Sequence, residues 1–177
     1  QIPVSHDLAP NPYENDKVRW AKDGSRFTYV YNQRGHQVLR VISVDAATGA
    51  SKALVDERSD TFIHYSGKYY LEFLDDAGEL VWMSERTGWN HLYLVDSRTG
   101  AVKNAITSGT WPVRAVEALD PVKRELFVRV MGVKPGVDPY YQDLAKVRLD
   151  GTGFQLLTSG DATHGVLLNA DKTLFVD

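Results

Sequence analysis

A serine, a glutamate and a histidine occur together in the segment SERTGWNHLYLVD, which runs from Ser84 to Asp96. In hydrolases, such side chains serve as nucleophile, general acid and general base. A serine nucleophile of the α/β-hydrolase type lies in a G-x-S-x-G turn between a strand and a helix. The nearest run is GASKA at residues 49–53, which ends in alanine and falls in a predicted hairpin turn. We therefore assign no catalytic residue, and we expect the chain alone to hydrolyse no peptide.

Metal chemistry is not predicted either. The five histidines are separated by 30, 28, 27 and 73 residues, so no pair has the short spacing of zinc ligands. Cysteine is absent, which excludes disulfides and thiolate sites. Asp75 and Asp76, in LDDAGE, indicate a turn and lack the ligand pattern of a calcium loop. Paired carboxylates of the glycosidase type could come from distant segments, but nothing in the sequence selects two, and we expect no metal and no cofactor.

Composition and charge are those of a globular protein. The chain is 43% hydrophobic and 24% charged, with a formal net charge of −3. The sequence has no cluster of Lys and Arg, so we expect no nucleic-acid partner. No apolar run approaches the roughly 18 residues of a membrane span.

Short strands dominate the predicted secondary structure. Apolar alternation with period two occurs in seven segments rich in β-branched and aromatic residues, separated by glycine and aspartate turns. These segments are 26–31, 38–44, 68–74, 79–85, 91–95, 124–131 and 144–149. No window has a helical stripe longer than three turns, so the sequence predicts an all-β chain.

The turns recur with a fixed period. Three turns end at Gly49, Gly100 and Gly151, which are 51 residues apart. AITSG at 105–109 reappears 51 residues later as LLTSG at 156–160. Four strands in each repeat of about 51 residues are typical of the blades of a β-propeller.

We predict a partial β-propeller in which residues 1–177 form a fragment of one domain. It has about three four-stranded antiparallel blades and half of a fourth, at approximately 17–57, 68–109 and 113–160, with the next blade beginning at 165–177. In HLYLVD (91–96) both faces of the strand are apolar, as expected for a sheet covered on both sides. Because such a fragment cannot close a ring, we expect its open faces and strand edges to drive self-association.

The segment SERTGWNHLYLVD (84–96) contains the connection between the second and third predicted strands of its blade. Its counterpart YNQRGHQV (31–38) occupies the same place in the first repeat. A recurring position favours a structural corner, in which Gly35 and Gly88 give backbone freedom and Trp89 is a packing anchor. His91 is predicted on an outer strand position, where its replacement by alanine would have a much smaller effect than loss of Trp89.

The third such loop, VMGVKPGVDPYYQD (130–143), is longer and breaks the repeat by insertion. Insertions in loops often carry function. Asp138, Tyr140 and Tyr141 are therefore the candidate binding residues. The alternative is that the two tyrosines only pack against the edge of the blade.

Two motifs, W-x-S-E-R-x-G-W-N-H-L-Y from Trp82 and I-T-x-G-x-W-x-V from Ile106, occur together with longer segments in the same order. These segments are VRWAKDGSRFTYVYNQRGHQVLRVISVDAATG (18–49), ELVWMSERTGWNHLYLVDSRTG (79–100), ITSGTWPVRAVEALD (106–120) and DPYYQDLAKVRLDGTGFQLLTSGDATH (138–164). From about Val18 to Asp177, the chain resembles the N-terminal β-propeller of dipeptidyl peptidase IV-like serine peptidases, in the prolyl oligopeptidase family.

The resemblance implies a parent enzyme in which a propeller of seven or eight blades covers a C-terminal α/β-hydrolase domain. That domain carries a Ser-Asp-His triad and removes dipeptides from peptide N-termini, while the propeller restricts access and contacts the substrate amine through two acidic residues on an inserted segment. No counterpart of that pair or of the triad occurs in this chain, so no such residue is carried over. The resemblance also favours a periplasmic or secreted location.

Two functions remain open from the sequence. The chain is either a non-catalytic propeller segment that gates peptide access to a hydrolase domain outside it, or a stand-alone binding propeller of the TolB or kelch type. A G-x-S-x-G motif downstream of Asp177, followed by Asp and His, would favour the first.

Overall fold

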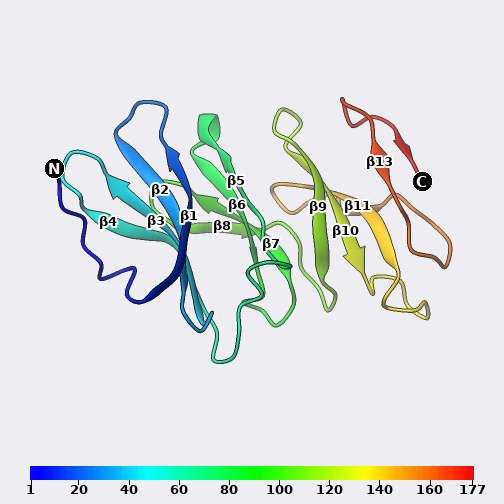
Figure 1. Ribbon diagram of the computed structural model, residues 1–177. Helices are drawn as coiled ribbons and strands as arrows, with labels where there is room; N and C mark the ends of the chain where they lie inside the picture. The colour runs from blue at the N-terminus through cyan, green and yellow to red at the C-terminus, as the bar shows by residue number, and fades with distance from the viewer. The chain divides into compact units, whose positions relative to one another are not determined.

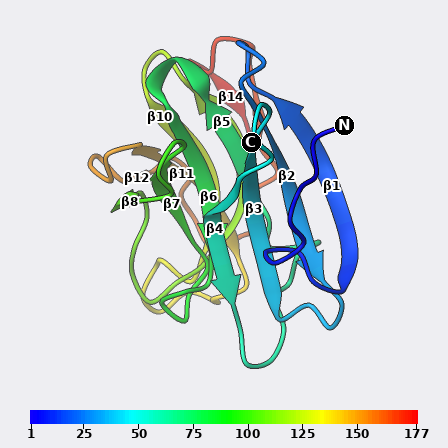
Figure 2. The same cartoon turned by 90° about the vertical axis from the view of Figure 1, so that its left-hand side faces the viewer.

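The computed structural model describes all 177 residues, which form strands and one 3₁₀ turn, η1(Asp75–Ala77), without an α-helix. There are three four-stranded antiparallel sheets and one two-stranded sheet, and in each the strands follow chain order (Figures 1 and 2). The strands are β1(Pro12–Trp20), β2(Arg26–Gln33), β3(Val38–Asp45) and β4(Ser51–Arg58); β5(Leu71–Leu74), β6(Glu79–Ser84), β7(His91–Asp96) and β8(Val102–Ala105); β9(Val113–Asp120), β10(Glu125–Met131), β11(Gln142–Arg148) and β12(Gln155–Leu156); and β13(Leu167–Leu168) and β14(Phe175–Val176). The predicted fold class, an all-β partial propeller, is confirmed. The structure contains no helix that is long and apolar enough to cross a membrane.

The chain divides into two compact units, which are described separately. Unit 1 consists of residues 1–67 and 96–101, and unit 2 of residues 68–95 and 102–177. Unit 1 contains the sheet β1–β4. Its first strand begins at Pro12, earlier than the predicted start of the blade at about residue 17, because the more polar part of β1 pairs with β2 through its backbone and contains two register shifts.

The N-terminal segment covers one face of the sheet in unit 1. Ala9 is buried with Tyr31, Ile42 and Val44 in one apolar cluster. A buried arginine on β3, Arg40, fastens this segment, because its Nη1 donates to the Leu8 carbonyl at 2.7 Å while its Nε donates to Asp56 at 2.8 Å. The segment is therefore held by apolar contact and by a charge-assisted hydrogen bond.

The core of unit 2 lies between two of its sheets, β5–β8 and β9–β12. Both sheets contribute buried apolar side chains to one cluster, which contains Val81, Met83, Leu92, Leu94, Ile106, Val113, Leu126, Val128, Val130, Ala145, Val147 and Leu149. On β7 the opposite face is buried too, at Tyr93 and Val95. Both faces of this strand are thus buried, as its sequence predicts.

The 51-residue repeat corresponds to a repeated turn. In the first copy, Asp45 Oδ1 accepts hydrogen bonds from the amide and the hydroxyl of Thr48, at 2.8 Å each. In the second, Asp96 Oδ1 accepts the same pair from Thr99, at 2.7 and 2.9 Å. The hydroxyl and amide of Thr48 lower the pKa of Asp45. An Asp-x-x-Thr-Gly turn therefore closes the hairpin between the third and fourth strands.

The glycine that ends each turn lies against backbone from an earlier part of the chain. All three copies have positive φ, and a Cβ on any of them would lie within 3.0 Å of a carbonyl oxygen. The pairs are Gly49 with Pro3 at 2.1 Å, Gly100 with Leu54 at 2.8 Å and Gly151 with Ala105 at 2.7 Å. Each contacted residue precedes its glycine by 46 positions, so the approach recurs with the period of the repeat.

A buried carboxylate links the two sheets in the core of unit 2. Glu79, at the start of β6, is 4% exposed. Its Oε1 accepts from Lys103 on β8, and Arg124, next to β10, lies 2.9 Å from its Oε2. Burial by itself would raise the pKa of Glu79, but the hydrogen bonds and charges of Lys103 and Arg124 outweigh it and lower that pKa.

Replacing Glu79 with glutamine should lower the free energy of unfolding by roughly 1–3 kcal/mol at pH 7, because both cations lose a charged partner. Since the folded pKa lies below the ordinary value of 4.5, the ion pair stabilises the fold above about pH 4.5. That contribution is lost as the pH falls through the folded pKa. Urea denaturation of wild type and Glu79→Gln should therefore give a difference that is larger at pH 7 than at pH 3.

Glu72→Gln, on an exposed position of β5, is the matched control and should change stability little at either pH. A Glu79→Gln effect that is equally large at both pH values would contradict the role of the ionised carboxylate.

Candidate functional site

The segment Ser84–Asp96 forms the turn after β6 and then strand β7. At its centre, Asn90 is buried and pairs with Val113 at the start of β9. The Asn90 side-chain amide donates to the Val113 carbonyl at 2.7 Å, and the Val113 amide donates to the Asn90 carbonyl at 2.8 Å. This reciprocal pair fixes the beginning of β7 against the beginning of β9.

The next residue, His91, is 2% exposed and uses both ring nitrogens. Nδ1 lies 3.0 Å from the Thr107 hydroxyl, and Nε2 lies 3.1 Å from the Gly109 carbonyl. Because a carbonyl can only accept, Nε2 carries the proton and Nδ1 accepts from Thr107. The Trp111 ring packs edge-on against the imidazole, 5.1 Å between centroids. With both nitrogens occupied, His91 is not placed to act as a general base.

The same arrangement occurs again in the third sheet. The Thr107 hydroxyl accepts from the Leu92 amide at 3.1 Å, and the Thr158 hydroxyl accepts from the Leu144 amide at 3.1 Å. In this second copy, Thr158 donates to the buried carboxylate of Asp143 at 2.9 Å. In both copies the hydroxyl of the threonine in T-S-G is hydrogen-bonded to two adjacent residues near the start of the third strand. We call this arrangement the threonine clasp.

The predicted packing roles of Trp89 and His91 are wrong. Trp89 is 41% exposed, whereas His91 is almost fully buried. Trp89 lies at the end of the turn, outside the strand, and has no core position to fill. His91 instead faces the threonine clasp, and the repeated T-S-G at 107–109 is the sequence feature that indicates this partner.

The inserted loop between β10 and β11 contains the predicted binding residues. Asp138 shapes a turn, since its Oδ1 accepts from the Tyr140 amide at 2.9 Å and its carbonyl from the Tyr141 amide at 3.1 Å. Tyr140 is 78% exposed, while Tyr141 is half-buried. The loop therefore presents one tyrosine to solvent on a turn fixed by an aspartate, and the other lies partly against the sheet.

A buried polar cluster that the sequence analysis missed anchors this loop. Lys134 Nζ lies 2.7 Å from Asp143 Oδ1 and donates to the Gly160 carbonyl at 2.7 Å. His164 is also buried, with Nδ1 2.5 Å from Asp177 and Nε2 3.7 Å from Asp143. Asp143 precedes Leu144 as His91 precedes Leu92, but a shift of 51 residues from His91 gives Gln142, so the repeat in the sequence does not indicate this cluster.

The known catalytic arrangements do not occur in this cluster. No group of three or more His, Asp or Glu side chains is placed to hold a metal ion. The hydroxyl of Thr158 is engaged between Leu144 and Asp143, so it is not paired with a base as a nucleophile would be. The cluster orders the loop, and what remains available for recognition is the exposed loop surface.

Comparison with known proteins gives one family and a set of similar folds. The family model described as the dipeptidyl peptidase IV (DPP IV) N-terminal region matches residues 1–177. A crystal structure of dipeptidyl peptidase 4 from Porphyromonas gingivalis is similar with a TM-score of 0.74 at 18% identity, over 98% of this chain and 23% of that one. A putative dipeptidyl aminopeptidase IV from Bacteroides ovatus is similar with a TM-score of 0.69 at 17% identity, over 92% of this chain and 25% of that one.

The stabilities of three alanine variants should separate the clasp from the exposed turn. Asn90→Ala and His91→Ala should each lower the free energy of unfolding by roughly 1–3 kcal/mol, because buried partners lose their hydrogen bonds. Trp89→Ala should lower it by less than His91→Ala does, since 41% of Trp89 is exposed and the residue is outside the core. Chemical denaturation followed by circular dichroism measures all three. A Trp89→Ala loss as large as that of His91→Ala would contradict this assignment.

Proposed function

The chain belongs to the dipeptidyl peptidase IV N-terminal region family, and from this membership we propose that it is a non-catalytic propeller segment of a dipeptidyl peptidase IV-like serine exopeptidase. Residues 1–177 are a fragment of one propeller domain, which gates and shapes the access of peptides to a hydrolase domain outside this chain. The observation that carries the proposal is the match of the family model over the whole chain, together with the four-stranded antiparallel sheets that such a propeller requires.

The lengths of similar proteins support a separate catalytic part. The chain spans about a quarter of the two similar solved chains, both of which are described as dipeptidyl peptidases or aminopeptidases. Within residues 1–177 the buried histidine His91 is saturated with structural hydrogen bonds. Peptide hydrolysis is therefore assigned to residues outside the chain, and recognition of the peptide is shared with its loops.

The loop between β10 and β11 is the part of this segment that we assign to peptide contact. Tyr140 is exposed, and its backbone is fixed by the Asp138 turn and by the Lys134 anchor. A tyrosine held in this way offers a large apolar surface and a hydroxyl with little further loss of conformational entropy on binding. Asp138 holds the backbone of Tyr140 in its turn, and Tyr141 is the next residue in the chain.

Self-association of the isolated segment is part of the proposal. Apolar side chains are exposed on β1, at Val18 and Trp20, and near the other end of the chain, at Leu167, Leu174 and Val176. Exposed apolar residues on unpaired edge strands favour pairing between chains. Within the parent enzyme these surfaces are expected to contact other parts of the protein.

The complete protein that carries this segment should be labelled by a fluorophosphonate probe on one serine, and that serine should map outside residues 1–177. In that protein, Tyr140→Ala should raise KM for a ten-residue peptide by about threefold to tenfold, or ~0.7–1.4 kcal/mol. The effect on a dipeptidyl chromogenic substrate should be less than about twofold, because so short a substrate does not reach the loop.

Val122→Ala is the matched control, since Val122 is exposed in the turn at the opposite end of β10. It should leave both substrates unaffected. Absence of a labelled serine anywhere in the protein would overturn the peptidase assignment and favour a binding platform of the TolB or kelch type. Equal effects of Tyr140→Ala on both substrates would overturn the assignment of the loop alone.

A further inference from the structure

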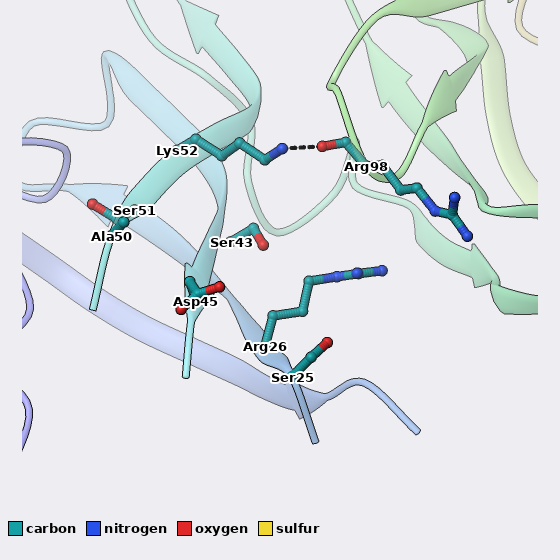
Figure 3. Close-up of a pocket in the computed structure, with 8 residues that line it drawn as sticks. All are labelled: Ser25, Arg26, Ser43, Asp45, Ala50, Ser51, Lys52 and Arg98. Atoms are coloured by element: carbon teal, nitrogen blue, oxygen red, sulfur yellow. Dashed lines mark hydrogen bonds between the residues drawn. The ribbon is translucent and has the colours of Figure 1, made fainter. Parts of the chain in front are cut away.

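A cavity of about 400 Å³ lies in unit 1, beside the Asp45 turn (Figure 3). Its volume is in the range of about 300–1,000 Å³ that is typical of small-molecule sites. Three cationic side chains line it, Arg26 from the start of β2, Lys52 from β4 and Arg98 from the turn before β8. Three elements that are distant in sequence therefore bring positive charge to one cavity.

The carboxylate in the lining does not neutralise these cations. Asp45 Oδ1 already accepts hydrogen bonds from the amides of Ala47 and Thr48 and from the Thr48 hydroxyl, at 2.8–3.0 Å. These bonds lower the pKa of Asp45, so the carboxylate stays ionised and is committed to its turn. With three cations and one anion, the lining carries a formal charge of +2.

Both guanidinium groups in the lining are without an ion pair. Arg26 interacts with the charge of Asp23 without forming an ion pair, and the Asp23 carboxylate is itself bonded to Ser25 at 2.7 Å. Arg98 is held by its backbone only, since its amide donates to Asp96 and its carbonyl accepts from Lys52. In Figure 3 the Arg26 and Arg98 side chains extend toward the same side of the view. Two guanidinium groups are thus available to a ligand.

A buried hydroxyl completes the set of donors. Ser43, on β3, is 4% exposed, and Figure 3 shows its hydroxyl directed between Lys52 and Arg26. The hydroxyl lines the cavity, where it can donate a hydrogen bond to a ligand.

We propose that this cavity binds a tetrahedral oxyanion, either free inorganic phosphate or sulfate, or the same group on a small organic molecule. Guanidinium groups donate pairs of hydrogen bonds to neighbouring oxygens of such an anion. Ser43 supplies a further donor from a different direction, and Lys52 adds charge. A carboxylate has two oxygens in one plane, whereas a tetrahedral anion presents oxygens in the several directions from which these donors approach.

Isothermal titration of the full chain with inorganic phosphate tests the site, with chloride balancing the ionic strength. Arg26→Gln and Arg98→Gln should each weaken phosphate binding at least tenfold, and Ser43→Ala should weaken it by about threefold to tenfold. Arg34→Gln is the control, because Arg34 is exposed beyond the other end of β2, about 26 Å away at ~3.3 Å per residue. It should leave the affinity unchanged within about twofold.

Thermal melts of the same variants show whether they fold, and they give a second readout of binding. Phosphate should raise the melting temperature of wild type and Arg34→Gln but not that of the Arg26→Gln, Arg98→Gln double variant, because a ligand stabilises only a fold that binds it. Sulfate and glycerol 3-phosphate serve as further probes. Tighter binding of glycerol 3-phosphate than of phosphate identifies an organic ligand, and the reverse identifies a free anion.

The proposal is overturned if 10 mM phosphate neither binds to nor stabilises the folded wild-type chain. It is also overturned if Arg34→Gln weakens binding as much as the lining variants do, since binding would then follow net charge. Acetate that binds as tightly as phosphate would overturn the assignment to a tetrahedral anion.

Discussion

A glycine with positive φ, placed directly against a carbonyl oxygen 46 residues earlier, recurs in every repeat of this chain. Gly49, Gly100 and Gly151 occupy this position, and none has room for a Cβ. Only glycine meets both conditions at once, because a side chain there would be strained by the backbone and would collide with the neighbouring strand. The contacted residues Pro3, Leu54 and Ala105 are themselves 51 positions apart, so the close approach has the period of the repeat.

The third and fourth strands are also held together by contacts within their own sheet. The threonine clasp joins the fourth strand to the start of the third, at Thr107 and at Thr158. The partner of the threonine changes from His91 to Asp143 while the geometry stays the same. The loop between the second and third strands lengthens between β10 and β11, where its Lys134 contacts the clasp residue Asp143. The threonine clasp is therefore kept where the length of this loop changes.

Most of the fold could be predicted from the sequence, because period-two alternation and the spacing of turn glycines are local properties. The polar start of β1 at Pro12 could not, since backbone pairing and not apolar alternation forms that part of the strand. The roles of Trp89 and His91 were wrong for another reason. The burial of His91 at the start of β7 depends on partners 16 and 18 residues away, at Thr107 and Gly109, and the pattern of a single strand does not contain those partners.

The candidate sites, like the fold, could be predicted from the sequence only in part. Insertion against the repeat identified the loop of Asp138, Tyr140 and Tyr141, but not the buried contact between Lys134 and Asp143 that anchors it. The oxyanion cavity gave no sequence indication, because Arg26 and Arg98 are 72 positions apart and converge only in the folded chain. Pairs of residues this far apart in the sequence can be recognised only in the folded structure.

The most direct measurement is the stability of two alanine variants at glycines with nearly equal backbone conformation. Gly151 has φ of +86° and a carbonyl oxygen 2.7 Å from its Cβ position, whereas Gly88 has φ of +87° and nothing within 4 Å. Gly88→Ala should lower the free energy of unfolding by about 1 kcal/mol, the strain of alanine at positive φ. Gly151→Ala should lower it by at least ~1 kcal/mol more, because the Ala105 carbonyl must also be displaced. Equal losses in urea denaturation would contradict the close approach of the turn glycine Gly151 to the Ala105 carbonyl.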